Sequence, residues 1–311
     1  MKLLVTNKYE DNEISKLVNL GYEVIYMKES KTEVNNENKD IEVLVGYNPF
    51  NTLDISKLEN LKLIQLSSVG IDQIPKDEII KSNITVCNNK GNYSIPIAEY
   101  IVMYILNVYK NTKQIYENQA QKKWKLDINL EELTDKKVMF IGTGTIAKNA
   151  ADRLKAFGVY VYGVNTDGRD VVGFDECISI GNINEGLKKS DVVVITLPST
   201  KETIGMINDE KLKTMKNGSV IINVGRGNII NENDLINNIS KFKGVCLDVF
   251  ESEPLNKENK LWEFENVTIT PHNSWISDKN RSRTFNTIYE NLKNYINNKE
   301  LKNVVNIQKG Y

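Results

Sequence analysis

The chain has few cysteines and almost no net charge. Cys87, Cys177 and Cys246 lie far apart, and no CxxC pair is present. The sequence therefore predicts neither a disulfide framework nor a cysteine-based zinc cluster, and we expect no metal site. A formal charge of -1 on 311 residues gives no long-range attraction to nucleic acid or anionic lipid. We expect small molecules as partners, no binding to nucleic acid and no binding to membranes.

Long apolar runs are also missing. The N-terminal segment MKLLVTNKYEDNE has only three consecutive apolar residues before polar ones begin, which is too few for the core of a secretory signal. No other run approaches the length that crosses a bilayer. We expect a cytoplasmic protein.

The length and the hydrophobic pattern favour two α/β domains. A chain of 311 residues is longer than one hydrophobic core usually organises. In its first part, short β-type runs alternate with amphipathic stretches, a rhythm typical of βαβ units and a parallel sheet. The expected strands are residues 2–6, 23–26, 43–46 and 63–66, and the expected helix is residues 12–20.

The pattern changes after residue 92. Residues 97–116 predict one long apolar helix, which we interpret as a crossover between lobes. A second alternating series begins at residue 137, and its six expected strands suit a complete doubly wound sheet. We expect a helix at residues 278–298 and a short strand at residues 301–306. The six strands are residues 138–142, 159–164, 192–197, 220–224, 244–249 and 267–270.

A glycine-rich loop follows the first strand of this second series. The segment VMFIGTGTIAKNAADRLKAFG carries GxGxxA at Gly142, Gly144 and Ala147. Gly142 permits a tight turn, Gly144 lets backbone amides approach a pyrophosphate, and Ala147 lets the helix pack on the strand. The letters alone also suit a structural turn, but the strand-loop-helix setting favours dinucleotide binding.

The next strand ends in Asn165, where an acidic residue would hold the adenosine ribose 2′-hydroxyl of NAD. Asn165, Thr166 and Arg169 can hydrogen-bond a 2′-phosphate, which a carboxylate would repel. Asp167 argues for NAD if its side chain turns inward, and an exposed turn with a solvated Arg169 is the structural alternative. We expect NAD(P) as cofactor and favour NADP over NAD.

Polar residues follow three other strands of the second series. His272, the only histidine, stands in ITPHNSW after a strand that should end at the carboxyl edge of the sheet, where ligands bind. Arg226 stands between two glycines in INVGRG and can hold a carboxylate in bidentate fashion. LDVFESEPL offers Asp248, Glu251 and Glu253. Taken singly, each of these residues could be structural or a surface charge.

Taken together, the motifs resemble those of the D-isomer-specific 2-hydroxyacid dehydrogenases, including the glyoxylate and hydroxypyruvate reductases. The glycine loop, TLPST, INVGRG, LDVFESEP and TPH occur in the order typical of that family. SSVGIDQIP and NKGNYSIPIAEY resemble its substrate loop and the entry into its crossover helix. The resemblance implies an α/β fold of two Rossmann-like lobes. A doubly wound parallel-sheet NAD(P)-binding domain, residues 97–276, would be inserted into a smaller flavodoxin-like substrate domain, residues 1–96 and 277–311.

The resemblance also implies an activity, hydride transfer between NAD(P)H and a small 2-oxo acid or D-2-hydroxy acid such as glyoxylate or hydroxypyruvate. Arg226 would bind the substrate carboxylate and polarise its carbonyl, His272 would donate the proton, and Glu253 would pair with His272. Hydride addition creates an alkoxide that a protonated imidazole neutralises, and a neighbouring carboxylate stabilises such a ring. The family often pairs through the crossover helix, so we expect a homodimer.

Further site residues follow from the same resemblance. Asp248 would contact the nicotinamide carboxamide, and the backbone amides at Val69 and Gly70 would grip the substrate carboxylate. HNSW departs from the small apolar residues usual after the family's histidine, and it leaves the role of Trp275 open. The predicted substrate-binding residues are Val69, Gly70, Asn92 and Ser274. The predicted cofactor-binding residues are Gly142, Thr143, Gly144, Thr145, Ile146, Asn165, Thr166, Arg169, Leu197, Pro198, Thr203, Val224, Gly225 and Asp248.

Other functions compete with this interpretation. A catalytically silent, dinucleotide-sensing regulatory protein could use the same scaffold, although Arg226, Glu253 and His272 together argue for chemistry. A Rossmann-type methyltransferase would need no such proton relay, and a formate dehydrogenase would place Gln where Glu253 stands. The sequence does not select one 2-oxo acid. It has no evident extra phosphate-binding cluster in its first lobe, and this favours an unphosphorylated substrate.

Overall fold

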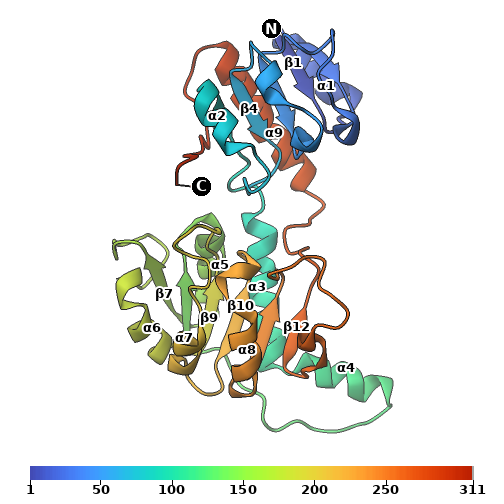
Figure 1. The fold of residues 1–311 in the computed structure, drawn as a ribbon. Helices are drawn as coiled ribbons and strands as arrows, with labels where there is room; N and C mark the ends of the chain where they lie inside the picture. The colour runs from blue at the N-terminus through green and yellow to red at the C-terminus, as the bar shows by residue number, and fades with distance from the viewer. Residues whose placement is uncertain (310–311) are drawn as a thin grey trace. The chain divides into compact units, whose positions relative to one another are not determined.

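The computed structural model describes residues 1–309, and they form two compact units (Figure 1). The first unit combines Met1–Asn92 with the chain from Ser277 onward, and the second unit is Tyr93–Ile276. In chain order the second unit is therefore an insertion in the first. Each unit holds a parallel sheet with helices on its faces, which confirms the predicted α/β fold class.

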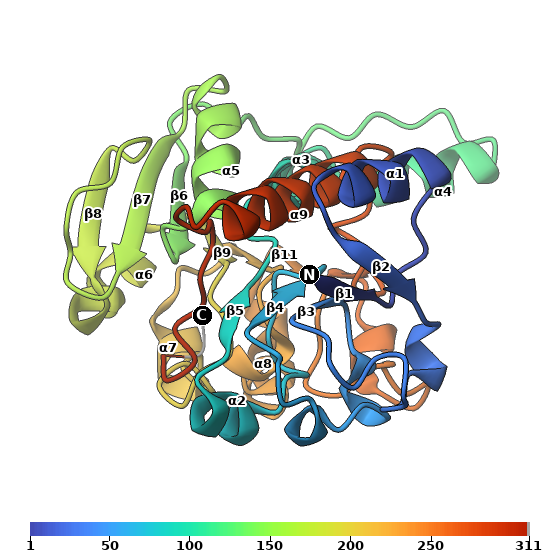
Figure 2. The ribbon, with the colours of Figure 1, turned by 90° about the horizontal axis from the view of Figure 1, so that it is seen from above.

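The first unit is built on a five-stranded sheet in the order β2-β1-β3-β4-β5. Successive strand residues face opposite sides. Leu3 and Val5 pack with α1 and α9, which lie side by side in Figure 2, whereas Leu4 packs on the side of α2. The elements are β1 (Lys2–Val5), α1 (Asp11–Asn19), β2 (Glu23–Tyr26), β3 (Val43–Gly46), β4 (Leu63–Leu66), α2 (Lys76–Ser82), β5 (Thr85–Cys87) and α9 (Asn280–Ile296).

The second unit contains a seven-stranded sheet in the order β12-β11-β10-β9-β6-β7-β8. Val138 and Phe140 of the inner strand β6 face the helices α3 and α5, while Met139 and Ile141 face α6, α7 and α8. The strands are β6 (Lys137–Ile141), β7 (Tyr160–Asn165), β8 (Glu176–Ser179), β9 (Val192–Ile195), β10 (Val220–Asn223), β11 (Gly244–Leu247) and β12 (Val267–Ile269). The helices are α3 (Ser94–Tyr109), α4 (Thr112–Ala120), α5 (Thr145–Lys155), α6 (Ile183–Lys189), α7 (Asp209–Thr214) and α8 (Glu232–Asn238).

The strand order of the second sheet determines where a ligand can bind. Its paired strands are all parallel, so their carboxyl ends lie at one edge. The next strand in sequence after β6 is β7 on one side, while β9 to β12 extend on the other. This reversal beside β6 is the topological switch point at which open α/β sheets bind ligands. The loops after β6, β9, β10, β11 and β12 carry most of the predicted site residues.

Several predicted boundaries are wrong. The helix expected at residues 97–116 is two helices, because Asn111 adopts a left-handed backbone (φ 46°) between α3 and α4. Residues 301–306 form a single antiparallel bridge from Val304 to Cys87 instead of a strand, and Asn303 beside it is also left-handed (φ 56°). The sheets also contain two strands that the sequence did not predict, β5 and β8. Among residues 1–309, no helix is long and apolar enough to span a bilayer.

Candidate active site

The glycine loop after β6 forms an open turn at the start of α5. Gly142 has φ 104°, and a Cβ atom there would lie 2.9 Å from Oγ1 of Thr196, so the turn requires glycine. A Cβ atom at Gly144 meets no described atom within 4 Å. In the described structure, α5 begins without a side-chain cap and without an acidic residue in its first turn. Open backbone amides at a helix N-terminus suit an anion, so this loop fits the pyrophosphate of a dinucleotide.

The loop after β7 is organised by Asn165. Its side-chain oxygen accepts a hydrogen bond from the Gly168 amide at 2.7 Å, and its side-chain nitrogen donates to the Arg169 carbonyl at 2.8 Å. Asn165 is buried, whereas Thr166 and Arg169 are exposed. The Arg169 guanidinium pairs with Asp167 at 2.7 Å. Asn165 therefore shapes the turn, and Thr166 and Arg169 present their side chains to solvent.

The loops after β9 and β10 pack directly on each other. Thr203 donates a hydrogen bond from its hydroxyl to the Pro198 carbonyl at 2.8 Å, which closes the loop after β9. A Cβ atom at Gly225 would lie 2.6 Å from the Leu197 carbonyl oxygen, so only glycine fits. This packing brings the predicted cofactor residues Leu197, Pro198, Thr203, Val224 and Gly225 together at the carboxyl edge.

Arg226 is held by a residue that the sequence analysis missed. Asn223, at the end of β10, is 1% exposed. It donates a hydrogen bond to the Arg226 carbonyl at 2.9 Å and accepts one from the Gly225 amide at 3.0 Å. On the other side, a Cβ atom at Gly227 would lie 1.9 Å from the carbonyl carbon of Phe250. Asn223 and Gly227 thus fix the backbone that presents Arg226. The sequence feature that could have identified Asn223 is its position as a polar residue at the end of the apolar strand VIIN.

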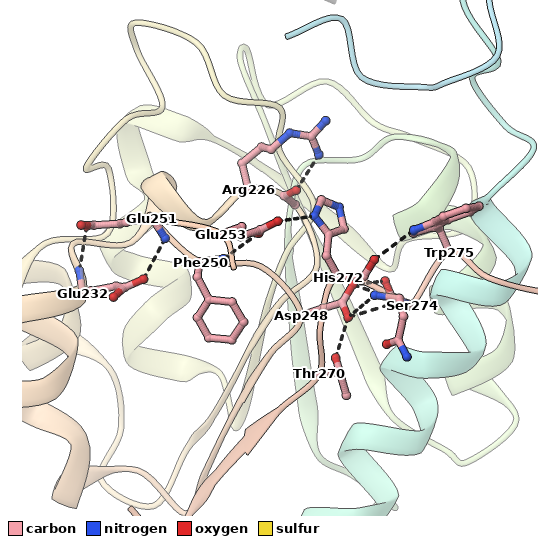
Figure 3. Close-up of polar contacts among 12 residues, drawn as sticks. Arg226, Glu232, Asp248, Phe250, Glu251, Glu253, Thr270, His272, Ser274 and Trp275 are labelled. Carbon is pink, nitrogen blue, oxygen red and sulfur yellow. Dashed lines mark hydrogen bonds and ion pairs between the residues drawn. The ribbon is translucent and has the colours of Figure 1, made fainter. Parts of the chain in front are cut away.

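The structure pairs His272 with Glu253 (Figure 3). The Nδ1 atom of His272 lies 2.7 Å from Oε2 of Glu253, and Oε1 of Glu253 accepts a hydrogen bond from the Phe250 amide at 3.0 Å. Both side chains are partly exposed, 42% for His272 and 35% for Glu253. The predicted pair therefore forms from two separate loops, those after β11 and β12.

The turn that carries His272 is anchored on Asp248. His272 has φ 50°, an uncommon conformation for a residue with a side chain, and its amide donates to the Asp248 carbonyl at 2.9 Å. The Asp248 carboxylate is 1% exposed. It accepts hydrogen bonds from the hydroxyls of Thr270 and Ser274, each at 2.5 Å, and from the Asn273 amide at 3.0 Å. Ser274 therefore contacts Asp248 (Figure 3).

Tyr104 extends this network into the core. Its hydroxyl lies 2.5 Å from Oγ1 of Thr270, which in turn donates to Asp248. Burial raises the pKa of Tyr104 well above its usual value, so the hydroxyl stays protonated. Trp275 supports the turn from the other end, because its indole nitrogen donates to the His272 carbonyl at 2.9 Å. The Trp275 ring also packs against Tyr93, with centroids 5.2 Å apart.

The predicted substrate residues of the first unit lie in two tight turns. The Val69 carbonyl accepts a hydrogen bond from Asn88 at 2.8 Å, and the Gly70 carbonyl accepts one from the Ser68 hydroxyl at 2.8 Å. These bonds fix the orientation of both peptides. Asn92 donates from its side chain to Asn89 at 2.9 Å and accepts from Thr287 at 3.1 Å.

No cluster of three or more His, Cys, Asp or Glu side chains suited to a metal ion occurs in the part of the chain that the structure describes. The arrangement at the second sheet instead combines a dinucleotide cradle, a guanidinium and an imidazole–carboxylate pair. The guanidinium of Arg226 is half-buried and donates a hydrogen bond to the Gly225 carbonyl at 2.8 Å. An imidazole beside a carboxylate can transfer a proton, and a guanidinium can hold an organic acid.

Comparisons with known proteins identify the family of the chain. The model of the D-isomer specific 2-hydroxyacid dehydrogenase, NAD binding domain, matches residues 102–274. A glyoxylate reductase of Thermofilum pendens is 33% identical over 241 residues, which cover 75% of this chain and 71% of that protein. A D-3-phosphoglycerate dehydrogenase of Methanocaldococcus jannaschii is 29% identical over 323 residues, 99% of this chain, and the chain spans only 60% of its length.

The solved structures show the same fold. A D-isomer specific 2-hydroxyacid dehydrogenase family protein from Aeromonas salmonicida aligns with a TM-score of 0.82 at 25% identity, covering 98% of this chain and 99% of that one. The fold and the site thus define an NAD(P)-dependent oxidoreductase that acts on the CH–OH group of its donor. The chain belongs to the D-isomer specific 2-hydroxyacid dehydrogenase family, as the sequence motifs predicted.

Proposed function

We propose that the chain reduces a small, unphosphorylated 2-oxo acid, such as glyoxylate or hydroxypyruvate, to the D-2-hydroxy acid. The observation that carries the proposal is the 2.7 Å contact between His272 Nδ1 and Glu253 Oε2. This contact orients the imidazole and leaves its Nε2 atom to meet the substrate oxygen. Arg226, Glu253 and His272 are the proposed catalytic residues.

Each of these residues has a defined task. Bound NAD(P)H supplies the hydride for the carbonyl carbon of the substrate. Arg226 holds the substrate carboxylate and polarises the neighbouring carbonyl group, because a guanidinium offers two parallel hydrogen bonds. His272 delivers the proton from Nε2 to the carbonyl oxygen as that oxygen becomes an alkoxide. Glu253 accepts a hydrogen bond from Nδ1 of His272 and so fixes the orientation of the ring.

The remaining site residues keep their predicted roles. We assign the glycine loop with Thr143, Thr145 and Ile146 to the cofactor pyrophosphate. The residues of the loops after β9 and β10, together with Asp248, are assigned to the nicotinamide half. Val69, Gly70, Asn92 and Ser274 remain the proposed substrate-binding residues.

We propose NADP(H) as the preferred cofactor. The loop after β7 supports this preference, because Asn165 stands at the strand end instead of a carboxylate and because Thr166 and Arg169 are exposed. Asp167 opposes it, since its carboxylate pairs with Arg169 at 2.7 Å. The strength of the preference for NADP(H) therefore depends on how far Asp167 competes with the 2′-phosphate for Arg169.

We propose a homodimer that forms through the segment after α3. In Figures 1 and 2, α4 and the chain that follows it project from the second unit as an arm. Along residues 121–132 the apolar side chains point outward, with Trp124 fully exposed, Ile128 89% exposed and Leu126 83% exposed. Such a row of apolar side chains favours a protein partner. Light scattering on the native chain and on a Trp124→Ser variant tests the assembly, and a monomeric native chain would exclude it.

The activity is tested by following NADH and NADPH absorbance with a panel of 2-oxo acids. We expect turnover of at least one small acid, and we expect His272→Ala to bind cofactor while losing about 10²–10⁴-fold in kcat, the usual contribution of a general acid. Cofactor binding without turnover of any acid would point to a dinucleotide sensor. Full activity of the His272→Ala variant would remove His272 from the mechanism.

A further inference from the structure

The proposed catalytic residue Glu253 lies on an exposed segment. Between β11 and the short 3₁₀ helix Lys260–Glu263, the described chain forms neither helix nor strand. Glu251, Ser252, Glu253 and Pro254 are all exposed. A contact of 2.7 Å with His272 nevertheless requires Glu253 to be held in one position. This segment therefore needs an anchor close to Glu253.

A reciprocal pair of hydrogen bonds supplies such an anchor. The Glu251 amide donates to Oε1 of Glu232 at 2.7 Å, and the Glu232 amide donates to Oε1 of Glu251 at 3.0 Å (Figure 3). Glu232 is the first residue of α8. Its second carboxylate oxygen accepts a hydrogen bond from the Asn259 side chain at 3.2 Å. We call the two reciprocal bonds the Glu232–Glu251 clasp.

The clasp acts next to the group that orients Glu253. It fixes the peptide between Phe250 and Glu251, and the amide of Phe250 donates to Glu253 at 3.0 Å. Phe250 is itself 7% exposed, and its backbone is closely packed on Gly227. The chain before Glu253 is thus held at Phe250 by packing and at Glu251 by the clasp. Loss of the clasp frees the residue two positions before Glu253.

We propose that Glu232 and Glu251 are positioning residues that hold Glu253 against His272. The inference rests on the proposed function, because it gives the two residues a role in the same proton-transfer site. Neither residue touches the reacting atoms. They act by keeping the Glu253 carboxylate oriented toward Nδ1 of His272.

The single histidine of the chain allows a direct test. Protein made without a histidine tag and labelled with [¹⁵N]histidine gives imidazole signals from His272 alone. We compare Glu232→Ala and Glu251→Ala with Glu232→Gln and Glu251→Gln, which keep a side-chain oxygen as acceptor. Glu258→Ala is the matched control, because it removes an exposed glutamate from the same segment. Glu253→Ala gives the signal of a broken pair.

We expect the alanine variants to move the His272 Nδ1 resonance toward that of Glu253→Ala and to lower kcat by about ten-fold or more, as small misplacements do. The KM for NAD(P)H should stay unchanged, and the glutamine and Glu258→Ala variants should behave as the native chain.

A native Nδ1 resonance in both folded alanine variants would overturn the inference, as would glutamine variants as impaired as the alanine variants. Because the resonance needs no turnover, it decides the role of the clasp even if no 2-oxo acid is reduced. If one alanine variant unfolds, the other tests the same clasp.

Discussion

The carboxylate of Asp248 accepts a hydrogen bond of 2.5 Å from the hydroxyl of Ser274, two residues beyond His272. Both residues are buried, with 1% and 2% of their surfaces exposed. The same carboxylate receives hydrogen bonds from Thr270 and from the Asn273 amide. His272 keeps its left-handed backbone between these anchors, and such a conformation persists only where the surroundings determine it.

We expect Asp248→Ala to destabilise the chain by about 3 kcal/mol, because it leaves several buried donors without an acceptor. Asp248→Asn should cost less, since its carbonyl oxygen can still accept from Ser274. Denaturant unfolding measures both effects, with the exposed Asp170→Ala as the control. Equal midpoints for Asp248→Ala and the native chain would contradict the anchoring role of this carboxylate.

Trp275 supports the turn that carries His272, and this support can be tested by substitution. Trp275→Phe keeps an aromatic ring beside Tyr93 but loses the hydrogen bond to the His272 carbonyl. One such bond contributes about 1 kcal/mol to stability. Its loss loosens the turn that places His272, so we expect kcat to fall by about ten-fold, as small misplacements do, with the KM for NAD(P)H unchanged. Steady-state kinetics at saturating cofactor measure the effect. A change only in the KM for the 2-oxo acid would instead indicate that the indole shapes the substrate pocket.

Substitution by alanine should weaken cofactor binding at one glycine, Gly144, and lower stability at another, Gly227. Gly144→Ala adds a Cβ atom in open space above the start of α5, so we expect normal unfolding but about ten-fold weaker NAD(P)H binding. Gly227→Ala drives a Cβ atom into the Phe250 backbone, so we expect a loss of stability of about 3 kcal/mol or more. Calorimetric titration and thermal unfolding separate the two outcomes. Unchanged cofactor affinity in Gly144→Ala would show that the loop does not hold the pyrophosphate.

The ion pair of Asp167 and Arg169 should control the choice of cofactor. We expect Asp167→Ala to raise the ratio of kcat/KM for NADPH over NADH by about three- to ten-fold, because it releases Arg169 for a 2′-phosphate. Arg169→Ala should lower the same ratio. If both variants keep the native ratio, the loop after β7 does not read the 2′-position.

The buried thiols should be unreactive in the folded chain. Burial raises the pKa of Cys87 to about 12 and that of Cys246 to about 12, and it also raises the pKa of Cys177. At pH 8 we expect slow reaction of Cys87 and Cys246 with a disulfide reagent such as DTNB and rapid reaction of all three after unfolding. The unfolded thiols ionise near pH 8.5, so unfolding releases protons above that pH and the free energy of unfolding should fall as pH rises. Rapid modification of Cys246 in the folded chain would contradict the burial.

The sheets were largely predictable because parallel strands buried on both faces are continuous apolar runs. Runs such as Val192–Ile195 and Val220–Asn223 could be located from the sequence alone. The edge strand Glu176–Ser179 escaped prediction because its residues are half-exposed and carry no such run. The helix break at Asn111 also escaped, because the apolar pattern continues on both sides of it.

The reactive residues of the candidate site could be predicted from the sequence where they follow the end of a strand. Arg226 and His272 follow strands directly, and parallel strand ends meet at one edge. Asn223 was missed because its role depends on a turn that the sequence does not reveal. The Glu232–Glu251 clasp joins residues 19 apart in the chain, and local patterns give no sign of such a contact. Supporting residues of this kind are identified from three-dimensional contacts.

The helix α3 has a consequence for dissecting the chain into fragments. Ile97, Ala98 and Ile101 are buried in the same apolar core as α5 and the central strands of the second sheet. The sequence family model begins only at residue 102, inside this helix. A recombinant fragment cut there would leave an apolar strip of the sheet uncovered and prone to aggregation. A cofactor-binding fragment should instead start at Tyr93 and stop at Ile276, where the second compact unit begins and ends.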